Sequence, residues 1–167
     1  ILWAAHMPHH TSEEMNLFVG VRASITQRLF SFIYMWPLAL VGFSPAAIYA
    51  ASAVQLILAF WHHTRLIDKM GLFEVIFNSP SYHRVHHAIN DKYLDKNFGE
   101  IFIIWDKMFG TCEKETEPVV YGALTPIQSC NPFKIYFHYW GFLFQDMLHT
   151  KSWWDKVRLW FMPLGWR

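Results

Sequence analysis

The stretch Ser79-Pro80-Ser81-Tyr82-His83-Arg84-Val85-His86-His87 carries three histidines at positions i, i+3 and i+4. On an α-helix, side chains with this spacing project from one face. Ser79 followed by Pro80 predicts where the helix starts, because serine caps free backbone amides and proline fits the first helical position. Three imidazoles on one face gain little as core packing but are good ligands for a transition metal. The stretch therefore predicts a helix that presents metal ligands.

The same histidine spacing recurs near the start of the chain, in His6-Met7-Pro8-His9-His10. Pro8 removes one backbone donor and predicts a local kink in a helix there. A third cluster, His62-His63, lies between the two triplets. One triplet would be weak evidence for a metal site, whereas two copies in 167 residues are a strong signal.

The composition is typical of a membrane protein. Hydrophobic residues make up 53% of the chain and aromatic residues 19%, whereas charged residues make up 16%, against about 25% in soluble domains. The length of 167 residues suits one domain. The net charge of +1 and the lack of a basic run give no sign of a nucleic-acid partner. Cys112 and Cys130 lack metal-ligand spacing and are predicted to be reduced and structural.

The clearest membrane signal is a run of 33 residues without a charge between Arg28 and His62. One straight helix of that length would measure about 50 Å, more than the roughly 30 Å of a bilayer's hydrocarbon core. The breakers in Gly42-Phe43-Ser44-Pro45 lie near the middle of the run. We therefore predict a transmembrane helical hairpin over residues 24–67, with its second leg at 45–67. A buried hairpin of a soluble protein is the alternative, although such a run exceeds ordinary core helices.

Charges at the two ends of this hairpin indicate its orientation. The turn between the legs carries no charge, whereas Arg22, Arg28, Arg65 and Lys69 all lie at the open end. The positive-inside rule places this end on the cytoplasmic side. We therefore expect an integral membrane protein of a bacterial inner membrane or the endoplasmic reticulum, with every histidine cluster at the cytoplasmic face.

The chain after Gly71 is predicted to lie outside the bilayer. An amphipathic helix should end near Gly110, and residues 111–132 are predicted to form a loop. Aromatic residues recur at helical spacing over 133–162, together with tryptophans and lysines, which predicts interfacial amphipathic helices. The predicted fold class is all-α: an integral membrane hairpin plus cytosolic helices that carry a histidine-rich dinuclear metal site.

The hairpin would bring the histidine clusters together at its open end. Seven imidazoles exceed the four to six ligands that one ion usually takes, so they predict two ions. The chain has no H-E-x-x-H zinc-protease motif, no cysteine pair for a structural zinc and no Glu-x-x-His pair of the ferritin-like diiron proteins. A histidine-rich dinuclear iron site beside a bilayer suits dioxygen chemistry on an apolar substrate. The predicted metal ligands are His6, His9, His10, His63, His83, His86 and His87.

The residues around these histidines resemble a known family, the fatty acid hydroxylase/sterol desaturase superfamily of integral membrane diiron oxygenases. The resemblance covers nearly the whole chain and is nearest to the alkylglycerol monooxygenase-like and bacterial sterol desaturase-like branch. The matching motifs are LWAAHMPHHTSEE at 2–14, FWHHT at 60–64, HRVHH at 83–87, NFG at 97–99 and IWDKMFGT at 104–111.

The resemblance implies that the two triplets and His63 ligate iron, whereas His62 falls where the family has an apolar residue and is not expected to ligate. It also implies that 1–167 is the C-terminal portion of a single fatty acid hydroxylase-type domain. The family has an earlier H-x(3-4)-H box that this chain lacks, so we expect a longer protein with the N-terminal part of the fold missing here.

Other polar residues near the triplets have two interpretations. Glu13, Glu14, Asn90 and Asp91 could orient ligand imidazoles through their second ring nitrogen. An ordinary capping or loop role is equally compatible with their positions. The two histidines near the end of the chain, His138 and His149, are predicted to be solvated or interfacial.

The resemblance implies an enzyme that hydroxylates or desaturates a C–H bond of a lipid, such as a fatty acyl, sterol or ether lipid. It would use dioxygen, two iron ions and electrons from outside, since no flavin, haem or nicotinamide motif is present. A reduced pterin or an electron-transfer protein would be the redox partner. The alternative is a non-catalytic membrane protein that binds metal or transports zinc. A transporter should place ionisable residues in mid-membrane, and the uncharged run has none.

Overall fold

Helices make up the architecture of residues 2–162, the part of the chain that the computed structural model describes. This part contains no β-strand, only two isolated bridges, Phe77 with Phe102 and Ala88 with Tyr121. The prediction of an all-α fold is confirmed. The elements are α1 (Leu2–His10), α2 (Leu17–Val21), α3 (Ile25–Leu40), α4 (Pro45–His62), the 3-10 helix η1 (Gly71–Val75), α5 (Pro80–His86), the 3-10 helix η2 (Asp91–Tyr93), α6 (Ile104–Phe109), α7 (Pro132–His149) and α8 (Trp153–Leu159).

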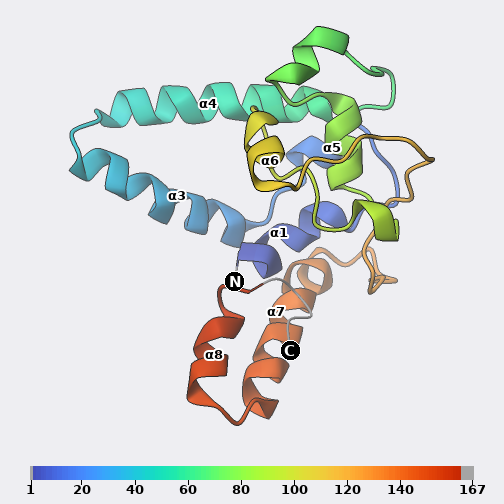
Figure 1. Cartoon of the computed structure of the whole chain (residues 1–167). Helices are drawn as coiled ribbons and strands as arrows, with labels where there is room; N and C mark the ends of the chain where they lie inside the picture. Colours follow the sequence, from blue (N-terminus) through green and yellow to red (C-terminus); the bar gives the residue numbers. More distant parts are fainter. Residues whose placement is uncertain (1, 163–167) are drawn as a thin grey trace.

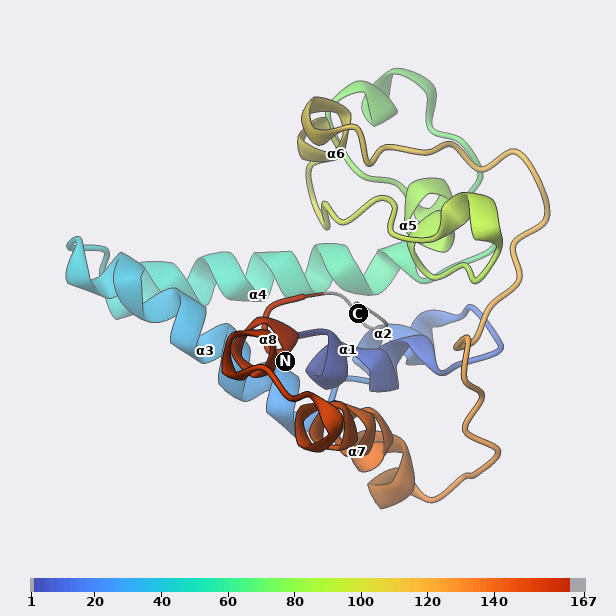
Figure 2. The ribbon, with the colours of Figure 1, turned by 60° about the horizontal axis from the view of Figure 1, so that its bottom comes forward.

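The two long helices α3 and α4 are joined by the turn at 41–44 and diverge from it like the arms of a V (Figures 1 and 2). At the open end, α5 packs on α4 and α1 packs on α3. The α7–α8 pair lies beyond α1, which it contacts through α7. The three histidine-bearing segments, α1, the end of α4 and α5, therefore meet at the open end of the V.

Four of the helix starts use a serine cap, and the fourth is Ser152 at the start of α8. Ser79 Oγ accepts a hydrogen bond from the Tyr82 amide at 3.3 Å, and Pro80 is the first helical residue, so the predicted start of α5 is confirmed. Ser44 and Ser24 cap α4 and α3 in the same way. The end of α6 is also as predicted. Gly110 follows it with φ +73°, a left-handed conformation that glycine adopts without strain.

The second leg of the predicted hairpin is too long by one turn. The helix α4 ends at His62, and His63 already has an irregular backbone, with φ −80° and ψ +63°. The carbonyls of Thr64 and Ile67 accept hydrogen bonds from the Arg84 guanidinium instead of from helical amides. The prediction that α4 continues to residue 67 was wrong because these carbonyls serve a side chain on α5.

Burial on the two arms is unlike that of a soluble core. No residue of α3 is buried, and on α4 only Ala59 and His62 are. Among the described residues, α4 is the one helix with the length and apolarity to cross a membrane, with a mean hydropathy of 1.3 over 18 residues. Only 11% of this window is buried, so α4 is not a core helix within the described part of the chain.

The α7–α8 pair covers α1. Tyr139 and Leu143 of α7 are buried against Ala4 of α1 and Ala123 of the preceding loop. That loop, at 111–131, contains no helix, as predicted. The predicted aromatic stripe of this region is divided between two surroundings. Trp140 packs against the buried cluster, whereas Phe133, Phe137, Phe144 and Leu148 are exposed.

Candidate metal centre

Eight histidines gather at the open end of the V, delivered by three segments. The first helix, α1, carries the first triplet, the end of α4 carries His62 and His63, and α5 with its C-cap carries the second triplet. In the triplet on α5, Ser79 and Pro80 set the start of the helix, so the three rings share the face that is turned toward α1 and α4. All eight side chains are buried or half-buried.

The seven predicted ligands form two groups whose ring nitrogens lie within 4.8 Å of one another. The first, which we call site A, is fully buried, whereas the second, site B, has two half-buried members. The two sites adjoin, because the rings of His10 and His87 stack with centroids 4.3 Å apart. Site A comprises His9, His63, His83 and His87, and site B comprises His6, His10 and His86.

Backbone carbonyls determine which ring nitrogen is free in site A. His63 donates through Nδ1 to the Ala59 carbonyl at 2.8 Å, and His9 donates through Nδ1 to the Arg22 carbonyl at 3.3 Å. In the neutral rings, each Nε2 then carries a lone pair. The two Nε2 atoms nevertheless lie 3.0 Å apart. Two lone pairs at this distance repel one another unless a cation lies between them.

The other nitrogen separations in site A are similar. His83 Nε2 lies 2.9 Å from His63 Nε2 and 3.2 Å from His87 Nε2. Nitrogens that share one ion, with bonds of about 2.0–2.1 Å, lie roughly 3.0–3.4 Å apart. In site B, His10 Nε2 is buried without a hydrogen-bond partner, which costs about 1–3 kcal/mol when no ion or water satisfies it. Both donor sets therefore fit a metal ion.

Burial keeps these imidazoles neutral. It lowers the pKa of His86 to about 4, with a further contribution from the nearby His6. It also lowers the pKa of His83 and of His87 well below the ordinary value, and the neighbouring imidazoles lower them further. Neutral imidazole is the form that binds a metal. The protein environment thus maintains the ligand form of these side chains at neutral pH.

Two aromatic rings stand beside site B. The Phe98 ring lies 6.1 Å from that of His86, and the Trp3 ring lies 6.4 Å from that of His6. The two aromatic rings contact each other edge to face at 5.8 Å. Both line the cavity described below. They form an apolar wall that limits the access of water to the imidazoles.

The loop that carries Phe98 is fixed by a buried carboxylate. Asp106, 2% exposed, accepts hydrogen bonds from the amides of Phe98 and Gly99 at 2.8 and 2.7 Å, and from the Thr111 hydroxyl at 2.6 Å. The role of Asp106 was not predicted from the sequence. A signal was available, because a lone acidic residue amid the apolar side chains of a short helix needs buried partners.

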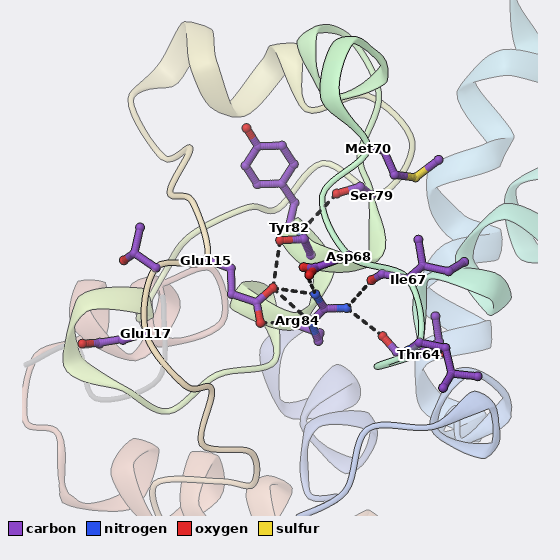
Figure 3. Close-up of polar contacts among 12 residues, drawn as sticks. Thr64, Ile67, Asp68, Met70, Ser79, Tyr82, Arg84, Glu115 and Glu117 are labelled. Atoms are coloured by element: carbon purple, nitrogen blue, oxygen red, sulfur yellow. Dashed lines mark hydrogen bonds and ion pairs between the residues drawn. The ribbon is translucent and has the colours of Figure 1, made fainter.

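A partly buried ion pair ties α5 to the loop at 111–131, and the same guanidinium ties α5 to the end of α4 (Figure 3). Arg84, 5% exposed, donates through Nε and Nη2 to the Glu115 carboxylate at 2.7–3.1 Å. Its Nη1 donates to the Thr64 and Ile67 carbonyls at 2.9 and 2.7 Å. Ser81 donates to the same carboxylate at 2.8 Å. These bonds fix the second triplet relative to His63, a role of Arg84 that was not predicted from the sequence.

The remaining predicted residues lie outside both groups. His62 is buried against Trp61 and does not belong to site A or site B. His138 and His149 lie on α7, away from the centre. Glu14 pairs with Arg65 at 2.7 Å, and Asn90 bonds to the backbone of Pro118 and Val120. Glu14 and Asn90 thus have the ordinary structural role, whereas backbone carbonyls orient the imidazoles. Both cysteines are free, as predicted.

A cavity of about 890 Å³ extends from the histidines into the space between α3 and α4. Its walls are mainly apolar side chains of these two helices, and Trp3 and Phe98 also line it. Five of the seven histidines line it: His6, His9, His63, His83 and His86. Such a cavity can hold an extended apolar molecule with one end at the imidazoles.

Comparisons with known proteins agree with this arrangement. The fatty acid hydroxylase family model matches residues 1–111. The chain is 42% identical to the alkylglycerol monooxygenase of Homo sapiens and 40% identical to that of Danio rerio, in each case over 99% of the chain and 37% of the relative. It is 27% identical to the ornithine lipid hydroxylase OlsE of Rhizobium tropici, over 70% of the chain and 36% of the relative.

No solved structure matches the chain. The chain spans less than two fifths of the length of the curated relatives it matches. The family model nevertheless covers both histidine triplets and the segment between them. This chain belongs to the fatty acid hydroxylase family.

Proposed function

We propose that the protein of which this chain forms part is a membrane-bound diiron monooxygenase that hydroxylates a C–H bond of a lipid. His9, His63, His83 and His87 would hold one iron ion, and His6, His10 and His86 the other. Hydroxylation is favoured over desaturation because the matched relatives are named monooxygenases and a hydroxylase.

One observation carries this proposal. The two histidine groups lie at the end of an apolar cavity of about 890 Å³, so a lipid chain in the cavity would reach the imidazoles directly. A metal site with a purely structural or storage role has no need for an apolar cavity of this size beside its ligands. The juxtaposition therefore supports metal chemistry on an apolar substrate.

The residues of the chain have three tasks in this proposal. Apolar side chains of α3 and α4 bind the lipid chain, and Trp3 and Phe98 exclude water from the end of the cavity. The carbonyls of Ala59 and Arg22 hold His63 and His9 with Nε2 turned toward the metal. Paired iron, when bound, supplies the activation of dioxygen that unactivated C–H bonds require.

The membrane arrangement is part of the proposal. The exposed apolar surfaces of α3 and α4 support a membrane-embedded hairpin within residues 24–67, in which α4 is the leg long enough to cross the bilayer and the centre lies at the cytoplasmic face. The exposed aromatic side chains of 133–162 support an interfacial position for α7 and α8. Electrons would come from a reduced pterin or an electron-transfer protein.

Labelled dioxygen tests this function. The full-length protein, reconstituted with iron, a reductant and a mixture of membrane lipids, is exposed to heavy-isotope dioxygen, and the lipids are analysed by mass spectrometry. We expect one heavy oxygen atom in a lipid product, formed only when iron and the reductant are both present.

The alternative, a metal-binding or zinc-transporting protein, gives a different result. In that case the protein would bind zinc, and no lipid product would form under any supply of iron and reductant. Bound zinc without oxygen-dependent lipid oxidation would overturn the proposed function.

A further inference from the structure

The apolar cavity contains a small polar cluster that the proposed metal chemistry does not use. Gln55, in the middle of α4, donates a hydrogen bond through Nε2 to Glu100 Oε2 at 2.6 Å. Both side chains line the cavity, as does Arg28 at the start of α3. Arg28 is close enough to Glu100 for its charge to favour the ionised carboxylate. We call these three residues the polar cluster.

This cluster lies where polar groups are costly. Gln55 is the one amide side chain in the 33-residue uncharged run, and apolar side chains surround it in the cavity. Burial raises the pKa of Glu100, against the opposing effects of Gln55 and Arg28. Polar groups within a membrane helix pair are rare and commonly mark a substrate site.

Fixing the loop around Glu100 does not require this cluster. The Asn78 side chain donates to the Gly99 carbonyl at 2.6 Å, and the Asn78 amide donates to the Ile101 carbonyl at 2.8 Å. Asp106 holds the Gly99 amide from the other side. Since the backbone on both sides of Glu100 is already held, a side-chain bond to α4 adds little as an anchor. The polar cluster therefore needs another explanation.

The chemistry of the cluster indicates what it can bind. Gln55 uses one amide hydrogen for Glu100 and has a second hydrogen and its carbonyl oxygen available for a ligand. One guanidinium and one carboxylate balance in charge. An anionic headgroup would therefore be repelled by Glu100 as well as attracted by Arg28. Hydroxyl groups, which both donate and accept, complement such a set without net charge.

We propose that Arg28, Gln55 and Glu100 bind the hydroxyl groups of a neutral lipid whose chain occupies the cavity. This inference rests on the proposed function of the cavity as the lipid site, and it names the class of headgroup. Gln55 lies eight residues before His63, on a helix that leads to it. The polar cluster thus fixes the depth at which the lipid lies relative to the imidazoles.

Two lipids that differ only in their hydroxyl groups test the proposal. The full-length protein in nanodiscs is titrated, without dioxygen, with hexadecylglycerol and with its dimethyl ether, in competition with a fluorescent lipid. For the native protein we expect tighter binding of hexadecylglycerol. The variants Gln55→Leu and Glu100→Leu should weaken its binding about tenfold, the effect of losing one or two buried hydrogen bonds.

The dimethyl ether distinguishes recognition from damage to the fold. Its affinity should stay within about twofold of the native value in both variants, because it offers no hydroxyl to lose. The matched controls Gln145→Leu on α7 and Glu117→Leu in the loop at 111–131 remove exposed side chains, and both affinities should stay unchanged.

Three outcomes would overturn the proposal, and they are distinguishable from failure of the proposed function. Equal weakening of both lipids in the variants would mean that the polar cluster only supports the fold. Tighter binding of hexadecylglycerol phosphate than of hexadecylglycerol would contradict a neutral headgroup. Equal affinity of the native protein for the two lipids would leave the lipid cavity intact but refute hydroxyl recognition. If neither lipid bound, the proposed function itself would fail.

Discussion

The histidine centre and the α3–α4 pair differ in which residues they bury and expose. The centre buries polar side chains, and the pair exposes apolar ones. In the centre, polar side chains such as His63, His83 and His87 are at most 5% exposed. On the α3–α4 pair, large apolar side chains such as Ile33 and Ile57 are 60% and 69% exposed. A soluble domain shows the reverse of both.

The contrast indicates that the two regions are stabilised by different partners. Buried imidazoles with facing lone pairs need a cation to bring them together. In the proposed membrane arrangement, lipid surrounds the exposed apolar surfaces of α3 and α4. We therefore expect that a change affecting the metal acts on the centre and leaves α3 and α4 intact, and that a change affecting the membrane does the reverse. The following predictions test this separation.

Removing one ligand should have the largest effect. His86→Ala deletes a member of site B, so the full-length protein should lose at least one metal ion per chain and nearly all oxygen-dependent lipid oxidation, more than about a hundredfold. Metal analysis of the purified variant and product assays measure the two losses. His149→Ala, on an exposed part of α7, is the control. Normal metal content in the His86 variant would refute its assignment as a ligand.

Breaking the partly buried ion pair should destabilise the centre without touching a ligand. Arg84→Ala leaves Glu115 without its main partner. Removing one partner of a fully buried pair costs about 3–5 kcal/mol in the free energy of unfolding, and because the Glu115 side chain is 21% exposed we expect about 3 kcal/mol. Arg158→Ala breaks an exposed pair with Asp155 and should cost no more than about 1 kcal/mol. Equal costs, measured by denaturant unfolding of the metal-loaded protein, would contradict the proposed tie of α5 to the loop at 111–131 and to the end of α4.

A charge on the outer face of α4 tests the membrane side of the comparison. Val54 is 55% exposed, so Val54→Lys would cost little in water. In a bilayer, a lysine near the centre of a helix costs roughly 2.5–3.5 kcal/mol of insertion free energy. Val120→Lys, at a loop position with similar exposure, is the control. Equal membrane insertion of the two variants would argue against a transmembrane α4.

Chelation should loosen one region only. With metal removed, amide hydrogen exchange in α1 and α5 should rise about tenfold or more, because a ligand that binds only the folded state stabilises that state. Exchange in α3 and α4 should not change while the protein remains in a bilayer. Hydrogen exchange with mass spectrometry resolves the four helices, and a uniform rise across all of them would contradict the separation.

Short-range sequence signals predicted much of the fold. Ser79 with Pro80 marks the start of α5, and Gly110 marks the end of α6, because caps and left-handed turns depend on neighbouring residues only. The spacing of the histidine triplets also predicted which side chains would share a face. The convergence of the seven histidines was expected from the hairpin and from the family resemblance.

Contacts between distant segments could not be predicted. The end of α4 was misplaced because Arg84, about twenty residues further on, takes the carbonyls of Thr64 and Ile67. The Gln55–Glu100 bond spans 45 residues and depends on where the loop after α5 lies. The one sequence feature that points to this bond is Gln55, a single amide side chain in an uncharged run. Such contacts follow from the packing of whole elements, which hydrophobic periodicity does not specify.

Metal content and coordination test the central claim most directly. The full-length protein should be purified without chelators, quantified for metals and measured by X-ray absorption at the iron edge. We predict two iron ions per chain, with imidazole nitrogen as the dominant ligand. A single ion per chain, or a full complement of zinc that iron cannot replace, would contradict the claim that the two histidine groups hold paired iron.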